Sequence, residues 1–476
     1  MYLKVEVWSL IDQVCNLAKI PIPTIDELNN LLDDKTYEIY EKGLTCTINQ
    51  ADSLWATGLV QKYKPRSVAE MSAFVAVIRP GCASFLEDFL SRKPYTTGVP
   101  ELDELLKEGN NRMLFQELIM RYLIWLGIPQ AGSYDIIKKI AKKKFKEEEL
   151  NELKSKLRDG WISKIGKEDG FEETWKAVEN AANYSFNSSH SLAYAYDSLY
   201  GAYLKSHYPL EYYTVALNMY SDDLERTPRL IKEMEFFNIT LHNPKFRHSQ
   251  ANYFYDKQNN SIYKGISSVK FLNENCAKEL YNRKNNVYNN FIELLVDLEE
   301  NSTINSKQIK ILIQLDFFDE FGKAGTLLNI YNEFSEGQFK YKKTYCEKTK
   351  KKRLEELLSL EFEDLEMPIK QQIQAQTEYY GTPTLIKPNL RGYAYILNVE
   401  TKGTPRITIY GLGNGKITVV KTWQKIYNKN KFKEGDIISH CKMTQRNKMK
   451  KVGEEWKTSD ELEWWLEEYT IEKIGF

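Results

Sequence analysis

The stretch Tyr184–Pro209, YSFNSSHSLAYAYDSLYGAYLKSHYP, decides how the middle of the chain folds. It opens with short polar side chains, among which Asn187 or Ser188 is placed to cap a helix by accepting a hydrogen bond from a free N–H. Aromatic and apolar residues then recur at spacings of three and four, which puts most of them on one helical face: Tyr196, Leu199, Tyr200, Tyr203, Leu204 and Tyr208. Two interpretations stay open, a capped core helix and a helix whose polar start binds phosphate through its dipole.

Around this stretch lies a chain of 476 residues, long enough for about three domains. Its apolar content of 42% and mean hydropathy of -0.53 are typical of a globular protein in water. It contains no run of about eighteen apolar residues, so we expect no membrane span. The start of the sequence lacks the features of a signal peptide. The sequence therefore predicts a soluble, cytoplasmic protein without a membrane partner.

Cysteine and histidine patterns exclude several kinds of site. The six cysteines are scattered without a CxxC pair, and the five histidines form no HExxH motif. Neither a disulfide framework nor a zinc site is expected from such spacing. A metal held by carboxylates remains open.

Charge is balanced overall but unevenly distributed. Lys+Arg and Asp+Glu both number 66, so net charge alone does not indicate a nucleic-acid-binding protein. However, Lys138–Lys144 contains five lysines and Lys348–Arg353 contains five basic residues. Each run is either a solvated helix face or a surface that binds a polyanion.

Three further motifs precede the opening stretch. KYKPRSVAEMSAFVAVIRPG (62–81) has a capping-type start at Ser67 and ends at Arg79, which either caps the helix or reaches into a cleft as a phosphate ligand. LFQELIM (114–120) begins an apolar segment that predicts a buried helix. GSYDIIKKIAKKK (132–144) predicts a helix from about Tyr134 with one strongly basic face.

These four motifs, in this order, resemble the fingers region of bacterial or phage DNA polymerase III alpha subunits, the C-family replicative polymerases. The family patterns run roughly KP…ALYRPG, LYQEQVM, GGADLLRRAMGKKK and GFNKSHSAAYA…WLKAHYP. The resemblance covers residues 1–335 well and the remainder more loosely. It implies an α+β, multidomain fold: mainly α-helical fingers and a helix-hairpin-helix region, followed by a small β-barrel like an OB-fold.

The resemblance also implies a nucleotide-binding site. Arg79 would approach the cleft that holds the incoming dNTP, and Lys138 and Lys139 occupy the positions of two family arginines. Lysine keeps the charge of arginine but loses its bidentate fork. The family's NKSH positions correspond to Asn187, Ser189 and His190, with Ser188 in place of the family lysine.

Residues 2–10, YLKVEVWSL, alternate apolar and polar side chains, which predicts a strand followed by a helix around Ile11–Lys19. They resemble the family strand that carries the last of three palm carboxylates, and Glu6 falls at that position as a catalytic residue and Mg²⁺ ligand. One carboxylate cannot hold two magnesium ions. We therefore hypothesise a split DNA-directed DNA polymerase, a nucleotidyltransferase that is inactive alone and shares Mg²⁺ with a separate palm and thumb partner.

Downstream, residues 255–283 resemble the family's helix-hairpin-helix segment, with KFLN (270–273) where the family has KGVG. The missing glycines put the backbone phosphate nest in doubt. Gln314–Phe318 is either helix core or a peptide that binds a sliding clamp. The residues predicted to contact primer-template DNA are Lys142, Lys143, Lys144, Lys264, Lys270, Arg406 and Lys442.

From Leu390 the sequence alternates in short strands separated by turns, which favours a small barrel that binds single-stranded DNA. Tyr393, Tyr395, Tyr410 and Trp423 either stack on bases or fill the barrel. The expected division is palm remnant 1–20, fingers 21–240, helix-hairpin-helix region 241–335, charged helical linker 336–389 and barrel 390–476. Two alternatives to a polymerase subunit are a non-catalytic DNA-binding protein derived from a polymerase and a helical scaffold.

Overall fold

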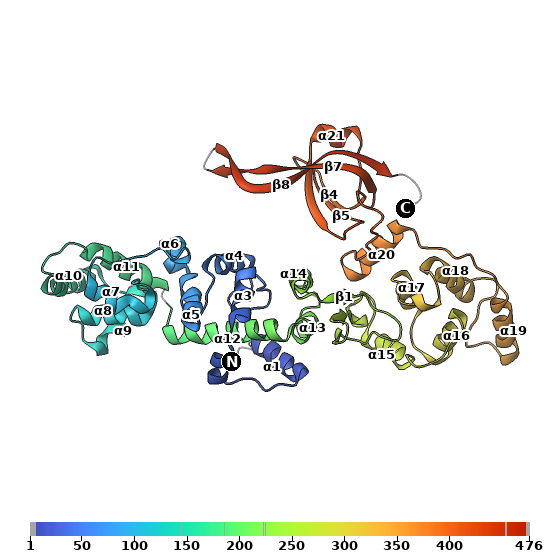
Figure 1. The fold of residues 1–476 in the computed structure, drawn as a ribbon, viewed down its shortest axis with the longest axis horizontal. Coiled ribbons are helices and arrows are strands. Elements are labelled where there is room, and N and C mark those ends of the chain that lie inside the picture. The colour runs from blue at the N-terminus through green and yellow to red at the C-terminus, as the bar shows by residue number, and fades with distance from the viewer. Residues whose placement is uncertain are drawn as a thin grey trace. The chain divides into compact units, whose positions relative to one another are not determined.

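The computed structural model describes residues 6–142, 144–184, 186–221, 223, 225–452 and 455–472 (Figure 1). The chain divides into two compact units, residues 1–240 with 255–262 and residues 241–254 with 263–476. Within the described ranges, no helix has the length and apolar character needed to cross a membrane.

The first unit is helical. Its elements are α1 (Glu6–Ala18), α2 (Ile25–Leu31), α3 (Asp34–Lys42), α4 (Leu54–Tyr63), α5 (Val68–Val77), η1 (Pro80–Cys82), α6 (Leu86–Leu90), α7 (Pro100–Leu106), η2 (Lys107–Gly109), α8 (Gln116–Trp125), α9 (Gln130–Ala141), α10 (Glu147–Ile165), α11 (Phe171–Tyr184), α12 (Ser188–His207), α13 (Pro209–Met219), α14 (Arg226–Met234) and η3 (Glu235–Phe237).

Helix α12 is the element around which the middle of this unit packs, and it contacts α1, α3, α5 and α13. Asn187 caps it by accepting a hydrogen bond from the backbone N–H of His190. Tyr200 and Tyr203 are buried, and the hydroxyl of Tyr200 donates to a backbone carbonyl. At Gly201 of α12 a Cβ would lie 3.1 Å from the side chain of Ile48, so a residue larger than glycine at this position would press on Ile48. The prediction of a capped core helix is confirmed.

A buried ion pair joins α12 to α14. The ammonium of Lys205, fully shielded from solvent, lies 2.6 Å from a carboxylate oxygen of Glu233. It also donates to the carbonyls of Leu44 and Cys46, so all three of its protons have acceptors. Such pairing is what allows an ammonium to remain in an apolar interior.

The start of the chain differs from the sequence-based expectation. Glu6 is the first residue of helix α1, and so the prediction of a strand over residues 2–10 is wrong for residues 6–10; residues 2–5 lie outside the described ranges. The apolar residues Leu10, Ile11, Val14 and Cys15 are all buried on one face. Their spacing of three and four satisfies a helix, which overrides the short alternation before it.

After η3 the chain forms a small sheet and continues in helices. Strands β1 (Thr240–His242), β2 (Phe254–Asp256) and β3 (Ser261–Tyr263) pair in the order β1-β3-β2. Then follow η4 (Ile266–Ser268), α15 (Glu274–Asn282), α16 (Phe291–Asn301), α17 (Ser306–Gln314), η5 (Asp319–Phe321), α18 (Ala324–Ser335), α19 (Glu347–Leu358) and α20 (Ile369–Tyr380).

One apolar core serves this helical part. It includes Leu312, Phe317 and Phe318, all nearly inaccessible to solvent. The interpretation of 314–318 as helix core is therefore supported over a free clamp-binding peptide, because its large side chains are buried. Leu357 of α19 and Ala375 of α20 belong to the same core, so the segment expected to be a charged linker packs onto the helices before it.

The C-terminal strands close into a barrel. They are β4 (Ala394–Glu400), β5 (Arg406–Gly411), β6 (Ile417–Thr422), β7 (Ile437–Val452) and β8 (Glu455–Glu472), with helix α21 (Gln424–Lys429) between β6 and β7. Their order is β4-β5-β6-β8-β7, and Ala394 of β4 pairs with Ile438 of β7 to close the ring. Together with the helical regions before it, this barrel confirms the predicted fold class.

Strands β7 and β8 form a long antiparallel hairpin (Figure 1). β7 contributes basic side chains and β8 contributes acidic ones to the ion pairs between them. Ion pairs join the two strands at Lys442–Glu468, Arg446–Glu467 and Lys448–Glu461. Lys442 and Glu468 lie directly opposite each other in the ladder, where opposite charges stabilise the pairing of two strands.

Candidate functional site

Arg79 lies at the centre of a cluster in the first unit. Its guanidinium donates to the side-chain carbonyl of Gln50 at 2.8 Å and lies 4.5 Å over the ring of Phe186. The Nε of Arg79 is buried without a hydrogen-bond partner among the described residues. Arg79 follows the last turn of α5, and the hydrogen bond of its side chain goes to Gln50. Its role as a nucleotide ligand stays a prediction.

The aromatic part of this cluster continues onto α12. The rings of Phe186 and His190 lie 5.0 Å apart, and His190 meets Tyr194 edge-on at 4.4 Å. His190 is exposed, as is Ser189. We call Gln50, Arg79, Phe186, His190 and Tyr194 the Arg79 cluster, since each contacts another member across three segments of the chain.

Glu117, in the LFQELIM motif, fixes the start of α12. It accepts a hydrogen bond from the side-chain amide of Asn187 at 2.6 Å and from the backbone N–H of Ser188 at 2.9 Å. Asn187 thus has all its described contacts inside the protein, as a helix cap and as a partner of Glu117. A carboxylate beside the N-terminus of a helix is also favoured by the helix dipole.

The predicted lysines of α9 are exposed. Lys138 and Lys139 lie in the last turn, with their ammonium groups 4.2 Å from the ring of Tyr134 and 5.5 Å from that of Phe145. Lys142 and Lys144 follow the helix and are also exposed, whereas Lys143 lies outside the described residues. None of these four described lysines forms an ion pair within the described part of the chain, which leaves their charge available to an anion.

Glu6 lines a polar cavity of about 390 Å³ together with Gln50, Asp52, Tyr220 and Arg226. Gln50 thus belongs both to this cavity and to the Arg79 cluster. Burial, and then the charge of Glu6, raise the pKa of Tyr220. Gln50 therefore lies next to two predicted site residues from separate motifs: Glu6 in the cavity and Arg79 in the cluster.

The donors around Glu6 do not fit a two-magnesium site. The other cavity carboxylate, Asp52, accepts bonds from Arg226 and from the backbone of Thr47, and its second ion pair is with Arg229. A carboxylate compensated by two guanidinium groups is a poor ligand for a second cation. Across the described residues, no three acidic, histidine or cysteine side chains gather as a metal site.

The predicted DNA-binding residues of the second unit separate into three kinds. Lys264 is wrong as a surface contact, because its side chain is buried and its ammonium lies 4.4 Å over the ring of Tyr380. Lys270 and Arg406 are exposed and form no ion pair with a described residue. Lys442 is exposed, but its charge is shared with Glu468 at 3.6 Å.

The barrel aromatics also separate. Tyr395 and Tyr410 are buried, but they pack with Ile373 of α20 and not with the barrel-interior residues, so they neither fill the barrel nor face a base. The Tyr410 hydroxyl donates to the carbonyl of Leu385. Trp423 is 44% exposed and stacks on Trp465 with ring centroids 4.3 Å apart. The guanidinium of Arg446 lies 5.3 Å from the Trp423 ring, which completes an aromatic and cationic surface. Tyr393 is half-buried.

Several members of these surfaces escaped the sequence analysis. Glu117 and Phe186 each lie inside a recognised motif, so their place in the motif could have identified them as members of the site. Gln50 and Trp465 had no such signal, because their neighbours come from distant segments. For Trp465 the decisive fact is the parallel pairing of β6 with β8, which sets it opposite Lys421.

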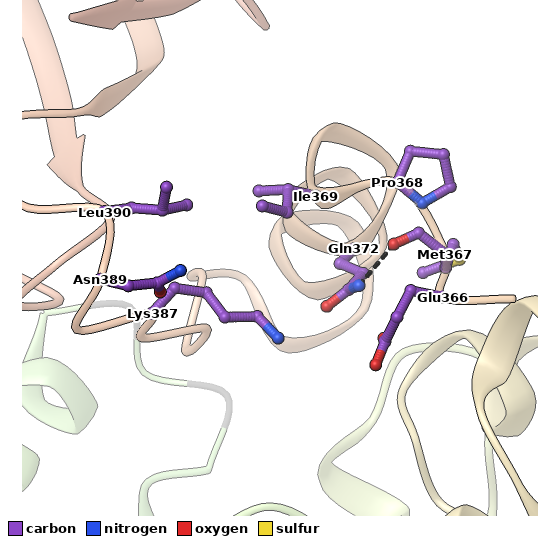
Figure 2. Close-up of a pocket in the computed structure, with 8 residues that line it drawn as sticks. All are labelled: Glu366, Met367, Pro368, Ile369, Gln372, Lys387, Asn389 and Leu390. Atoms are coloured by element: carbon purple, nitrogen blue, oxygen red, sulfur yellow. Dashed lines mark hydrogen bonds between the residues drawn. The ribbon is translucent and has the colours of Figure 1, made fainter. Parts of the chain in front are cut away.

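A cavity of about 550 Å³ in the second unit lies apart from all predicted site residues (Figure 2). It is bordered by Glu366, Ile369 and Gln372 on the approach to and start of α20, and by Lys387 and Leu390 before the barrel. The amide of Gln372 donates to the carbonyl of Met367, which fixes the first turn of α20.

Comparison with known proteins relates both units to one family. Residues 9–164 match the bacterial DNA polymerase III alpha subunit finger domain, and residues 238–327 match a helix-hairpin-helix motif. The DNA polymerase III subunit alpha of Aquifex aeolicus is 29% identical over 295 residues, which cover 60% of this chain and 25% of that protein. The Bacillus subtilis subunit is 26% identical over 329 residues, 68% of this chain and 29% of that protein.

The matched regions thus span about a quarter of the length of these relatives. They include Arg79, Glu117 and the helices that follow β3. The chain is a distant relative of the bacterial DNA polymerase III alpha subunits, with a match to their finger domain and a second match to a helix-hairpin-helix motif.

Proposed function

We propose that this chain provides the fingers and part of the DNA grip for templated DNA synthesis, and that a separate palm-bearing protein supplies the remaining carboxylates. In this role the first unit binds the incoming dNTP, and the second binds primer-template DNA. The polymerase relationship supports this assignment, and so does the placement of the Arg79 cluster.

The observation that carries the proposal is the convergence of two motifs at the Arg79 cluster: the motif that ends in Arg79 and the stretch that contains Phe186 and His190. A guanidinium with an unpaired Nε, held over Phe186 and beside exposed His190, is prepared to bind a phosphate oxygen. The unpaired lysines at the end of α9 add positive charge for a polyanion. Phe186 limits the rotamers of Arg79, so less freedom is lost when an anion binds.

Glu6 has a place in this proposal as one carboxylate of a Mg²⁺ site completed from outside this sequence. Because the described donors do not fit two magnesium ions, the chain alone is expected to be inactive. The test is primer extension by the purified chain, by a palm-bearing protein captured from the native source, and by the two together. Synthesis by the purified chain without a partner would contradict the split arrangement.

Glu6→Ala is the matching variant, with the exposed Glu38→Ala of α3 as control. If Glu6 binds the metal, Glu6→Ala abolishes extension by the reconstituted pair and leaves DNA affinity unchanged, while Glu38→Ala extends normally. Normal extension by Glu6→Ala would remove Glu6 from the mechanism.

A second candidate is a non-catalytic DNA-binding protein derived from a polymerase. The placement of Glu6 at the start of a helix, with no metal-ligand cluster in the described residues, favours it. This candidate predicts DNA binding that weakens steeply with salt, without extension under any reconstitution. A flat salt dependence would instead indicate a scaffold whose basic runs are merely solvated.

A further inference from the structure

The hairpin that joins η4 to α15 presents an aromatic side chain to solvent. Val269 and Leu272 anchor this hairpin in the apolar core, and the backbone N–H of Lys270 donates to the carbonyl of Tyr379 at 3.0 Å. Phe271, between these anchors, is 45% exposed. The fold therefore holds the backbone on both sides of Phe271 while its ring faces outward.

The backbone at Phe271 adopts a conformation that disfavours phenylalanine. Its φ is +71°, in the left-handed region where glycine or asparagine is usual. A bulky residue there costs free energy, and incomplete burial of the ring returns only part of the hydrophobic gain. Residues kept in this region against their preference cluster at functional positions.

Two ammonium groups lie beside the ring. The Nζ of Lys307 is 3.3 Å from the ring centroid and that of Lys270 is 5.1 Å from it. Neither lysine forms an ion pair within the described ranges. Lys307 also lies in the first turn of α17, where the helix dipole disfavours a cation. Its ammonium is stabilised by the Phe271 ring and not by the helix, and its charge remains available to an anion.

An exposed aromatic ring beside two cations without an ion pair among the described residues matches the alternation of base and phosphate along a nucleic-acid strand. Aromatic side chains stack on bases of any sequence, and lysines pair with the flanking phosphates. The hairpin lies within the helix-hairpin-helix match, so it belongs to the part of the chain assigned to DNA.

We propose that Phe271 packs against a base or deoxyribose of DNA, while Lys270 and Lys307 contact the phosphates on either side. This contact stands at the position where the family has the glycines of its backbone phosphate nest. The inference rests on the proposed function, because it names how the second unit holds DNA.

The first test compares DNA affinity of the full chain with that of Phe271→Ala and of Phe236→Ala, a control with 46% exposure on η3 of the other unit. Single-stranded, duplex and primer-template DNA are used as separate arms. We expect Phe271→Ala to weaken binding by about 5- to 50-fold in at least one arm and Phe236→Ala to leave it unchanged. Equal affinities of wild type and Phe271→Ala in every arm overturn the inference alone; a wild-type chain that binds no DNA overturns the proposed function as well.

A second variant separates loss of the ring from loss of the fold. Phe271→Gly suits the positive φ, so the protein is expected to unfold at the same or a higher temperature. It should nevertheless bind DNA as weakly as Phe271→Ala. Wild-type affinity in Phe271→Gly would show that the backbone, and not the ring, makes the contact.

Two further measurements locate the contact. DNA containing 5-iododeoxyuridine, irradiated in the complex, should cross-link to the peptide that contains Phe271. Lys270→Gln and Lys307→Gln should each lower the slope of log affinity against log salt by about 1, whereas Lys278→Gln, whose charge is paired with Glu274, should not. Cross-linking elsewhere in the second unit, with unchanged salt slopes, would contradict the proposal.

Discussion

The side-chain amide of Asn187 donates a hydrogen bond to the carboxylate of Glu117 at 2.6 Å, and so joins the starts of α12 and α8. The same carboxylate accepts the N–H of Ser188, one of the free donors at the start of α12. Two of the four motifs that identified the family are thus held together by one glutamate.

Glu117→Ala is expected to loosen the start of α12. The loss of two hydrogen bonds to a charged acceptor should lower the free energy of local opening by about 1–3 kcal/mol. Amide hydrogen exchange in peptides covering residues 186–196 measures this. Glu108→Ala, which removes an exposed partner of Arg121, serves as control and should leave exchange unchanged. Equal protection in both variants would contradict a structural role for Glu117.

Replacement of Arg79 by lysine should lower the rate of nucleotide incorporation. In the reconstituted polymerase, Arg79→Lys and Arg79→Ala should both lower kcat/KM for nucleotide incorporation by about 10- to 100-fold, since lysine lacks the planar fork that stacks on Phe186 and reaches a phosphate. Arg92→Lys is the matched control, because Arg92 stacks over Tyr63 and pairs with Glu70. Full activity of Arg79→Lys would exclude a bidentate contact.

The buried pair Lys205–Glu233 should be costly to break. Lys205→Met leaves the Glu233 carboxylate without its cation and should lower the free energy of unfolding of the first unit by about 3–5 kcal/mol. The double variant Lys205→Met/Glu233→Gln should recover about 1–2 kcal/mol, since no uncompensated charge remains. Urea unfolding measures both, with Lys42→Met at an exposed pair as control. A single variant as stable as wild type would contradict this account.

Wild type and Lys264→Met should differ in stability by an amount that depends on pH. Burial lowers the pKa of the Lys264 ammonium from 10.5 to about 8. Because the folded protein binds this proton less tightly than the unfolded chain does, protonation favours unfolding. The stability is full above pH 10.5, and it falls with the pH until the loss is complete below about pH 8. Lys264→Met should therefore raise the free energy of unfolding by up to about 3 kcal/mol at pH 7 and by little near pH 10.5.

Denaturant unfolding of wild type and Lys264→Met at the two pH values gives this difference, and Lys278→Met controls for general effects of removing a charge. A stability difference that is the same at both pH values would mean that Lys264 has the same pKa in the folded and the unfolded protein, which would contradict this account.

The features that could be predicted from the sequence are those set by residues close together in the chain. The caps at Ser67 and Asn187 and the alternating strands of the barrel were predicted because a helix start and a strand face are set by near neighbours. The family was evident from the order of its motifs. For Glu6 the alternation was too short to distinguish a strand from the start of a helix, and the following apolar spacing decided for the helix.

Distant contacts could not be predicted in this way. Lys264 has the sequence signature of a surface lysine, yet Tyr380, far along the chain, covers it. The contact of Gln50 with Arg79 and the stacking of Trp465 on Trp423 likewise depend on how separate segments meet. The candidate site was thus predicted in its motif residues and missed in the residues that hold them.

The ion pairs across the β7–β8 hairpin bear on how this sequence can diverge. Because Lys442, Arg446 and Lys448 each form an ion pair with an acid of the opposite strand, a charge reversal on one strand alone brings like charges together across the hairpin. Relatives with this hairpin should therefore change sign at both positions of a pair together. Reversing the charges of all three pairs at once would keep every ion pair and would move the basic side chains from β7 to β8. The hairpin can therefore exchange its basic and acidic strands, provided that each pair keeps opposite charges.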